Sequence, residues 1–175
     1  MLYVTRHGET TWNVQGLVCG RADVPLTEKG RQQANALADK VATLEVPVTK
    51  IIHSPLQRAK DTAQAVADKV ELPLIADARL MEMDFGAYDG MPSNETIFQE
   101  ARLEFGVRFP EGESLFDMYA RVVPVLQECL ADEENTYLLV CHNALIRAIN
   151  AYFTPMPNDK FFDFFVENTE LLSYN

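Results

Sequence analysis

Segments that favour strand and segments that favour helix alternate along most of this chain of 175 residues. Short runs of β-branched and other apolar side chains predict strands at residues 2–6, 50–54, 72–77 and 136–142. Apolar side chains spaced three and four residues apart predict helices at residues 27–44, 54–70, 114–132 and 143–153. This order indicates a three-layer, doubly wound α/β fold, in which a mostly parallel sheet carries helices on both faces.

Polar residues mark where several of these helices begin. Thr27 is a suitable N-cap, and Ser54 followed by Pro55 is a good N-cap and first helical residue. Ser114 and Asp117 have the spacing of a capping box. These signals predict helix starts directly after the strand at 50–54 and at residue 114.

Residues 86–112 lack the regular alternation and contain several glycines and prolines. We expect a loop, a short helix and a second loop there, forming a small cap over the site. Residues 161–175 contain two strand-like runs around a turn. We see no internal repeat or linker, so we expect a single domain over residues 1–175, with 86–112 as a cap insertion.

The charge of the chain limits its partners. It has 15 basic and 26 acidic residues, a net charge of −11. Such a chain should repel nucleic acid and anionic membrane surfaces. It should also repel a phosphorylated metabolite, unless a few arginines are concentrated in one cleft.

The sequence favours a cytoplasmic protein. It contains no apolar run of about 18 residues and no basic, apolar leader of the secretory type. Its cysteines are Cys19, Cys129 and Cys141, an odd and scattered set that argues against a disulfide framework. No C-x-x-C pair is present, so a structural zinc site is not expected.

Two of the three histidines, His7 and His142, close predicted strands. In open α/β sheets, ligands bind beyond the carboxyl ends of the strands. Two imidazoles facing one substrate there can do nucleophilic or acid–base work near neutral pH. The alternative is a pair of structural histidines, which is the commoner situation for a single histidine.

Two arginines and a glutamate accompany these histidines. Arg6 precedes His7, and Arg58 lies in the first turn of a predicted helix, where backbone N–H groups already favour anions. Two guanidinium groups can bind phosphate oxygens, although each arginine could instead pair with a surface carboxylate. Glu82 is a candidate acid beside such a phosphate. By composition alone, Glu9 and Asp84 compete with it.

The segment "TRHGETTWN" (5–13) resembles the signature of the histidine phosphatase superfamily, the phosphoglycerate-mutase-like proteins. Further segments resemble the family in the same order: "DVPLTEKGRQQA" (23–34), "HSPLQRAKDTA" (53–63), "LMEMDFGAYDG" (80–90), "PEGES" (110–114) and "LLVCHNALIRA" (138–148). The resemblance covers nearly the whole chain. It implies an enzyme that transfers phosphoryl groups through a phosphohistidine.

The resemblance also implies roles for particular residues. His7 matches the nucleophile and Glu82 the general acid. The rest of the phosphate pocket is matched by Arg6, Arg58 and a cationic His142. Because arginines supply the positive charge, no metal or other cofactor is expected.

Other positions match the family less closely. Asn13 matches a polar residue that touches the phosphate or orients the nucleophile, and Thr10 and Arg21 lie where relatives contact substrate. Asn143 stands where the family often has glycine, and its side chain could cap the following helix. His53 replaces a small polar residue and is interpreted mainly as a packing residue. Cys19 is assigned no catalytic role.

The resemblance leaves the activity open between a phosphatase and a mutase. Mutases of the family have a larger insertion over the site and a tail after the last strand. A site without such a tail should admit water, which favours hydrolysis. The chain is therefore predicted to be a metal-independent phosphatase, with a cofactor-dependent phosphoglycerate mutase as the alternative.

Two further alternatives are weaker. A non-catalytic phosphate-binding relative should lack one of the core residues, and all are present. Metal binding by His7, His53 and His142 lacks the usual ligand spacing. The aromatic cap suits a small phosphate ester with apolar or ring surface, which keeps the α-ribazole phosphatase, broad-specificity phosphatase and sugar-bisphosphatase branches open. The protein is expected to be a monomer or a homodimer.

Overall fold

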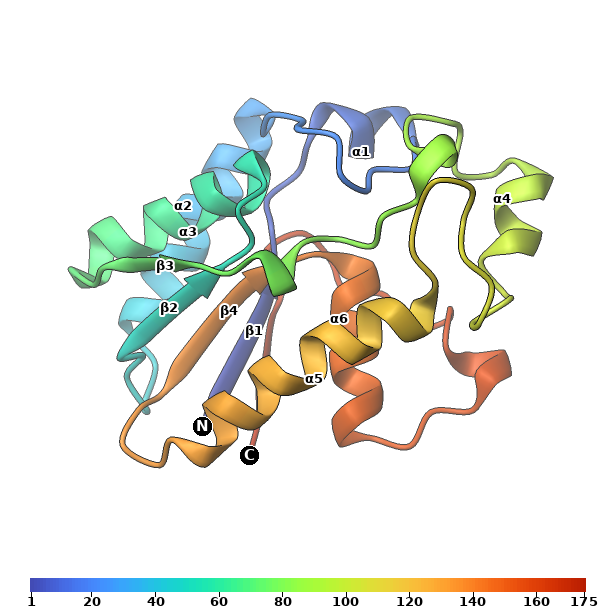
Figure 1. Cartoon of the computed structure of the whole chain (residues 1–175). Helices are drawn as coiled ribbons and strands as arrows, with labels where there is room; N and C mark the ends of the chain where they lie inside the picture. The colour runs from blue at the N-terminus through green and yellow to red at the C-terminus, as the bar shows by residue number, and fades with distance from the viewer.

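A computed structural model describes all residues, 1–175. Five strands form one sheet in the order β3-β2-β4-β1-β5 (Figure 1). Neighbouring strands are parallel except for the last, which runs antiparallel to β1. The strands are β1 (Leu2–Arg6), β2 (Lys50–His53), β3 (Leu74–Ala76), β4 (Tyr137–Cys141) and β5 (Leu171–Tyr174).

The register of the three inner strands places the two key histidines at one edge of the sheet. Arg6 at the end of β1 pairs with Cys141 at the end of β4, and His53 of β2 pairs with Val140 of β4. The residues that follow β1 and β4 are His7 and His142. Because β4 is the central strand and is buried along its whole length, it fixes the position of the backbone at this edge of the sheet.

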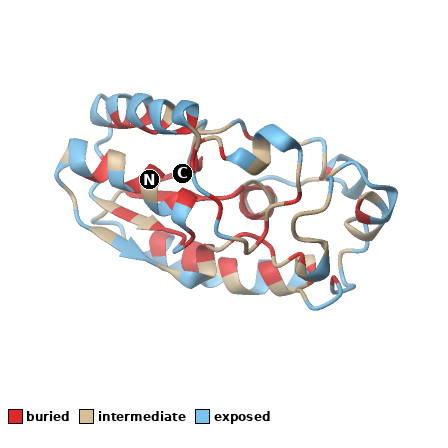
Figure 2. Ribbon diagram, turned by 90° about the horizontal axis from the view of Figure 1, so that it is seen from above, coloured by how far each residue is buried: buried red, intermediate tan, exposed pale blue.

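Two pairs of helices cover the two faces of the sheet (Figure 1). Helices α2 (Glu28–Ala42) and α3 (Gln57–Val70) pack together on one face, and α5 (Leu115–Ala131) and α6 (Asn143–Phe153) on the other. Buried residues follow the strands and the helix sides that face them (Figure 2). The predicted doubly wound α/β fold is confirmed. None of the helices combines the length and apolarity needed to cross a bilayer.

Several predicted helix starts are confirmed, and one is wrong. Thr27 accepts a hydrogen bond from Gly30 N at 2.9 Å, and Ser114 and Asp117 form the capping box. Helix α3, however, begins at Gln57 with Leu56 as its N-cap, so Ser54 is not the N-cap. The hydroxyl of Ser54 instead lies 2.7 Å from Nε2 of His142, and it is thereby drawn into the site.

The cap consists of a 3₁₀ turn (Gly86–Tyr88), helix α4 (Thr96–Ala101) and the loops around them. Phe85 and Phe109 pack edge to face, as do Phe85 and Phe98, and the three side chains join the larger hydrophobic core. The predicted loop, short helix and loop are therefore present. Two more 3₁₀ turns lie outside the cap, at Ala78–Leu80 and Asn158–Lys160.

Two local predictions need correction. A short helix, α1 (Thr11–Gln15), follows His7 and was not expected. Of the two strand-like runs near the carboxyl end, only Leu171–Tyr174 is a strand. The earlier run is irregular because side chains occupy the backbone groups of Val166: its carbonyl accepts from Arg6 Nη1 at 2.9 Å, and its N–H donates to Asn143 Oδ1 at 3.1 Å.

Candidate active site

A cavity of about 480 Å³ opens at the carboxyl ends of β1 and β4. Four of the predicted site residues line it: Arg6, His7, Asn13 and Glu82. The remaining walls come from the cap and from the segment between α6 and β5. A cavity of this size holds a small metabolite rather than a phosphate group alone.

His7 is a buried imidazole held by the backbone. The residue is 3% exposed, and Nδ1 lies 2.7 Å from the carbonyl of Gly8. A carbonyl can only accept, so Nδ1 carries the proton and the lone pair is on Nε2. Burial, reinforced by Arg58 and Arg6, holds the pKa of His7 well below its usual value. Gly8 keeps this geometry because a side chain there would overlap the backbone of Gly30.

His142 lies beside His7, with 5.1 Å between the ring centroids. It is fully buried, and its Nδ1 has no hydrogen-bond partner. Burial and the neighbouring Arg58 hold the pKa of His142 well below its usual value. These surroundings oppose the cationic His142 that the resemblance implied, because removing an imidazolium from water next to a guanidinium is unfavourable.

Arg6 and Arg58 keep positive charge at this site without a carboxylate partner. Arg6 donates to the carbonyl of Val166, and its Nε has no partner. Arg58 is fully buried behind the cavity wall, where its guanidinium donates to the carbonyls of Ala22 at 2.8 Å and Gly20 at 2.7 Å. Carbonyl oxygens satisfy N–H groups without cancelling the charge, so both guanidinium groups remain available to attract an anion.

Glu82 is held at the first turn of α6. Its carboxylate accepts hydrogen bonds from the backbone N–H groups of Met83 (2.8 Å), Ala144 (3.1 Å) and Leu145 (3.2 Å). These contacts fix the carboxyl group at the cavity wall while leaving it free of any arginine or lysine.

The competing acids are placed less well than Glu82. Glu9 also lines the cavity, but its carboxylate is paired with Lys29 at 2.8 Å. Asp84 accepts from Gly86 N and does not line the cavity. Of the three acids that the sequence offered, Glu82 is therefore the best placed to exchange a proton with a ligand.

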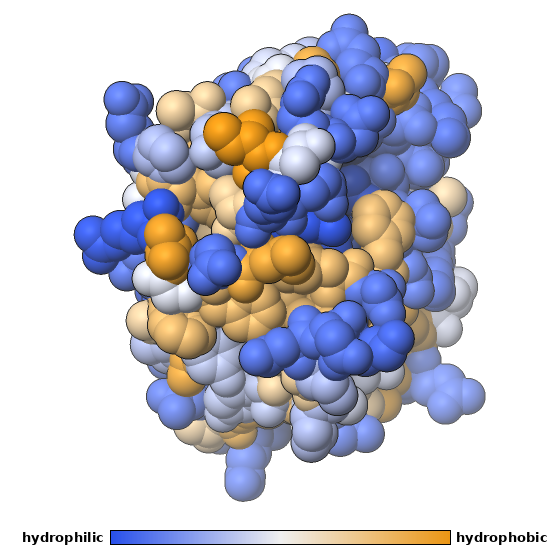
Figure 3. Space-filling model, turned by 90° about the vertical axis from the view of Figure 1, so that its right-hand side faces the viewer, coloured by the Kyte–Doolittle hydropathy of each residue, from blue (hydrophilic) through white to orange (hydrophobic).

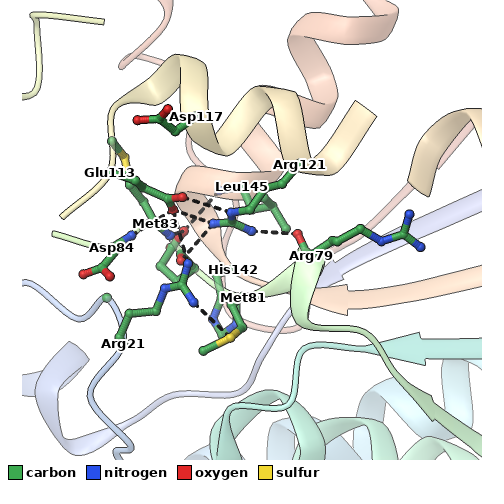
Figure 4. Close-up of polar contacts among 12 residues, drawn as sticks. Arg21, Arg79, Met81, Met83, Asp84, Glu113, Asp117, Arg121, His142 and Leu145 are labelled. Atoms are coloured by element: carbon green, nitrogen blue, oxygen red, sulfur yellow. Dashed lines mark hydrogen bonds and ion pairs between the residues drawn. The ribbon is translucent and has the colours of Figure 1, made fainter. Parts of the chain in front are cut away.

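The structure does not bring every predicted contact residue to the cavity. Asn13 lines it, with Oδ1 accepting from Thr10 N at 3.0 Å. Thr10 itself is buried as the N-cap of α1 and does not line the cavity. Arg21 also lies outside the lining, where it contacts the sulfur of Met81 and the carboxylate of Glu113 (Figure 4).

Sequence reasoning missed the pair that supports the Glu82 backbone. Arg121 of α5 donates to the carbonyls of Glu82 at 3.0 Å and Arg79 at 2.6 Å, and it forms a salt bridge with Glu113 at 2.6 Å (Figure 4). Glu113 also accepts from Asp84 N at 3.0 Å. The backbone on both sides of Glu82 is thus tied to one ion pair. The motif "PEGES" contained Glu113, but nothing near it in sequence pointed to Arg121.

It also missed the segment that precedes β5. Phe162, Phe165 and Asn168 of this segment line the cavity, and Nδ2 of Asn168 donates to the carbonyl of His7 at 2.8 Å. The guanidinium of Arg6 lies 5.1 Å from the ring centroid of Phe165. The site is therefore covered by residues that lie before the last strand.

Three other residues were singled out from the sequence: His53, Asn143 and Cys19. His53 is buried, with Nδ1 2.8 Å from Ser54 O, and it does not line the cavity. Asn143 is the first residue of α6 rather than its cap. Cys19 lines the cavity, and burial raises the pKa of its thiol to about 11. No group of three His, Cys, Asp or Glu side chains is arranged to hold a metal ion.

The carboxyl edge of the sheet thus brings together two histidines and two arginines that have no carboxylate partner. The family model described as histidine phosphatase superfamily (branch 1) matches residues 2–175. The chain therefore belongs to the histidine phosphatase superfamily, as its motifs predicted.

Individual relatives carry two kinds of name. A protein of Enterobacter sp. (strain 638) described as a probable phosphoglycerate mutase GpmB is 35% identical over 165 residues, 89% of this chain and 75% of the relative. The solved structure of a mycobacterial glucosyl-3-phosphoglycerate phosphatase matches with a TM-score of 0.84 at 28% identity, covering 97% of this chain and 87% of that one. A putative α-ribazole-5′-P phosphatase from Escherichia coli K-12 matches with a TM-score of 0.83 at 26% identity, with the same coverage.

Proposed function

We propose that this protein is a metal-independent phosphomonoesterase that acts on a small phosphorylated metabolite through a phosphohistidine on His7. The observation that carries the proposal is the pairing of His7 with His142, whose ring centroids are 5.1 Å apart, beside two arginines that donate to carbonyls and have no carboxylate partner. Such an arrangement places a nucleophilic nitrogen inside fixed positive charge.

In the first step, the ester phosphate enters beside Arg6 and Nε2 of His7 attacks phosphorus. The N–P bond forms as the bond from phosphorus to the ester oxygen breaks, and Glu82 in its protonated form gives that oxygen a proton, so the product is an alcohol. In the second step, Glu82 takes a proton from water, the water oxygen attacks phosphorus, and the N–P bond breaks. Inorganic phosphate and neutral His7 are restored.

The charge distribution suits both steps. A phosphate dianion loses its hydration on entering, and Arg6 and Arg58 replace it with fixed charge that needs no reorganisation. The buried Nδ1 of His142 lacks a partner, and an oxyanion that raised the pKa of this imidazole would let Nδ1 donate. Surface acids more than about 8–10 Å away are screened at cellular salt.

The names of similar proteins point in opposite directions on the choice between phosphatase and mutase. Two solved structures that match 97% of this chain are named as phosphatases. The sequence relatives at 32–35% identity are named as probable phosphoglycerate mutases. We favour hydrolysis because the structural matches span the cap as well as the sheet, and we keep the mutase as the second candidate.

The test is an assay that measures both phosphate release and the exchange of phosphoglycerate isomers. Wild type is incubated with an aryl phosphate, with a panel of metabolite esters, and with 3-phosphoglycerate primed by the bisphosphate. We expect release of inorganic phosphate that persists in EDTA, and a phosphohistidine trapped at His7 by acid-free mass spectrometry. Exchange of 2- and 3-phosphoglycerate faster than phosphate release would favour the mutase.

Two variants control this assay. His7→Ala should abolish both the trapped intermediate and the turnover. His53→Gln removes a histidine that lies outside the cavity and should retain both. Full activity in folded His7→Ala would overturn the proposal.

A further inference from the structure

The arginines of this acidic chain fall into two groups. Those of the first group form salt bridges with carboxylates: Arg21, Arg31, Arg79, Arg108 and Arg121. Those of the second group have no carboxylate partner: Arg6, Arg58, Arg102 and Arg147. Among 26 acidic residues, an arginine left without one is unusual. Arg6 and Arg58 are explained by the phosphate site, and Arg102 and Arg147 are not.

Arg102 and Arg147 line the same cavity as His7, together with Phe162. Their guanidinium carbons lie 4.6 and 5.3 Å from the centroid of the Phe162 ring. We call these three residues the far end of the cavity, and Arg6, His7, Arg58 and His142 the phosphate end. The far end is built where helix α4 meets the segment between α6 and β5. That side of the molecule combines a band of apolar surface with polar groups above and below it (Figure 3).

Both arginines keep donors without acceptors. The Nε of Arg147 donates to the carbonyl of Phe164 at 2.8 Å, and its two Nη groups have no partner. The buried Nε of Arg102 has none. Burial lowers the pKa of Arg147 to about 10, so it stays charged near neutral pH. Arg147 is buried and Arg102 is partly buried, and neither guanidinium group has a carboxylate partner, so an anion bound in this cavity can accept from both.

The acids of the cavity do not fill this need. Glu9 is paired with Lys29, and Glu82 is held by three backbone N–H groups. Neither carboxylate forms a salt bridge with Arg102 or Arg147, although the charge of Glu82 partly offsets the effect of burial on the pKa of Arg147. Both guanidinium carbons lie over the ring of Phe162, and a planar guanidinium group matches an oxyanion.

We propose that the far end is a second anion subsite, so that the substrate is a phosphate monoester carrying a second oxyanion, a carboxylate or another phosphate, held by Arg102 and Arg147. The inference rests on the proposed function for the identity of the first anion. Under this proposal the reaction takes place at the phosphate end, and the far end determines which phosphate esters bind.

The test measures binding without turnover. In the His7→Ala background, isothermal titration compares 3-phosphoglycerate with glycerol 3-phosphate, which differ by one carboxylate. A second pair, glucose 1,6-bisphosphate and glucose 6-phosphate, differs by one phosphate. We expect the compound with the second oxyanion to bind roughly 10- to 100-fold tighter in at least one pair, and the pair with the larger ratio identifies the second oxyanion.

Arg102→Gln should reduce that ratio roughly tenfold. Arg147→Lys keeps the charge of a buried side chain but not its fork, and should reduce the ratio by a smaller factor. Arg108→Gln is the matched control, because Arg108 is a cap arginine whose side chain is 71% exposed and paired with Asp117. It should leave the ratio unchanged. Thermal melts confirm that each variant is folded.

The inference is overturned if the affinity ratios of both pairs are near one. It is also overturned if Arg102→Gln weakens the binding of both members of a pair equally, because the arginines would then only hold Phe162 in place. The proposed function fails separately. Wild type that hydrolyses no ester, while His7→Ala keeps the ratio and Arg102→Gln lowers it, would leave the subsite standing and remove the phosphatase.

Discussion

The phosphate end and the far end of the cavity both present arginines, but they are built from different parts of the chain. At the phosphate end, Arg6 closes strand β1, and His7 and His142 directly follow β1 and β4. At the far end, Arg102 ends the short helix α4, and Phe162 lies in an irregular segment. One end is fixed by paired strands. The other is fixed by the packing of α4 and an irregular segment against helix α6, which carries Arg147.

This difference indicates that the two ends of the cavity have different roles. Groups that must meet a reacting phosphorus within a fraction of an ångström benefit from a parallel sheet whose central strand is buried. Groups that choose among substrates can lie on segments that tolerate change. The two ends should therefore respond differently to substitution: changes at the phosphate end should reduce turnover, and changes at the far end should alter preference.

The largest expected effect in this comparison concerns Glu82. Glu82→Gln removes the transferable proton and keeps one oxygen that can accept from the backbone N–H groups of Met83 and Leu145, while the N–H of Ala144 loses its acceptor. We expect kcat on alkyl phosphates to fall by roughly 10²- to 10⁴-fold. With an aryl phosphate, whose leaving group needs no proton, the loss should be much smaller. Initial rates on both ester classes measure the difference.

An equal loss on both esters would contradict the acid role of Glu82. Glu9→Gln is the control, because Glu9 lines the same cavity but is paired with Lys29. If Glu9→Gln showed the leaving-group dependence in place of Glu82→Gln, the roles of the two acids would be exchanged.

The next effect concerns Arg121, which holds the backbone beneath Glu82. Arg121→Gln removes the donors to the carbonyls of Glu82 and Arg79 and leaves Glu113 with only the longer salt bridge to Arg21. We expect kcat to fall roughly tenfold with KM nearly constant, because a displaced acid affects the transition state more than binding. The leaving-group dependence should resemble that of Glu82→Gln, which a purely structural role would not produce.

Arg79→Gln is the matched control, because the side chain of Arg79 pairs with Asp77 and Glu128 while only its carbonyl serves Arg121. It should leave kcat close to that of wild type. Arg121→Lys should recover part of the loss. If KM rose and kcat did not change, Arg121 would be assigned to binding instead.

The contrast between the two ends also explains what the sequence could predict. Alternating patterns gave the sheet and its helices, and Arg6, His7, Glu82 and His142 stand in local motifs at the ends of predicted elements. At the far end, Arg102 and Phe162 lie in none of these motifs, and Arg147 lies in "LLVCHNALIRA" without any local sign that it faces the cavity. Arg102 and Arg147 are 45 positions apart in the numbering, and they come together because the end of α4 and the segment with Phe162 pack against α6.

The errors of prediction have the same origin. Ser54 has the residue type of an N-cap, but its hydroxyl contacts His142, which lies 88 positions along the chain. The earlier of the two strand-like runs near the carboxyl end does not form a strand, because the side chains of Arg6 and Asn143 bond to the backbone of Val166. In each case a contact between distant residues overrode a local preference.

A smaller effect should appear in stability against pH. The folded pKa of His7 and that of His142 lie well below the usual value of about 6.5. Below that pH the unfolded chain binds protons that the folded chain does not. The free energy of unfolding therefore decreases as the pH is lowered, by at most about 1.4 kcal/mol per pH unit for each histidine. Above it, this contribution is fully present.

Urea titrations between about pH 7 and about pH 5.5 measure this slope. His7→Gln should lose about half of the histidine contribution, so its free energy of unfolding should approach that of wild type as the pH falls. Arg102→Gln, at the far end, should keep the wild-type slope. Identical slopes for wild type and His7→Gln would mean that His7 is charged in the folded protein.

The smallest expected effect concerns Phe162, which lies between the two far-end arginines. Phe162→Leu keeps most of the apolar volume but removes the ring face that contacts Arg102 and Arg147. A cation–π contact contributes about 0.5–1 kcal/mol or more, so we expect the preference for a second oxyanion to fall roughly two- to fivefold. The reason is that the guanidinium groups lose orientation rather than charge. Competition titrations in the His7→Ala background resolve such a change. A fall in preference as large as that of Arg102→Gln would show that Phe162, rather than the arginine charge, selects the ligand.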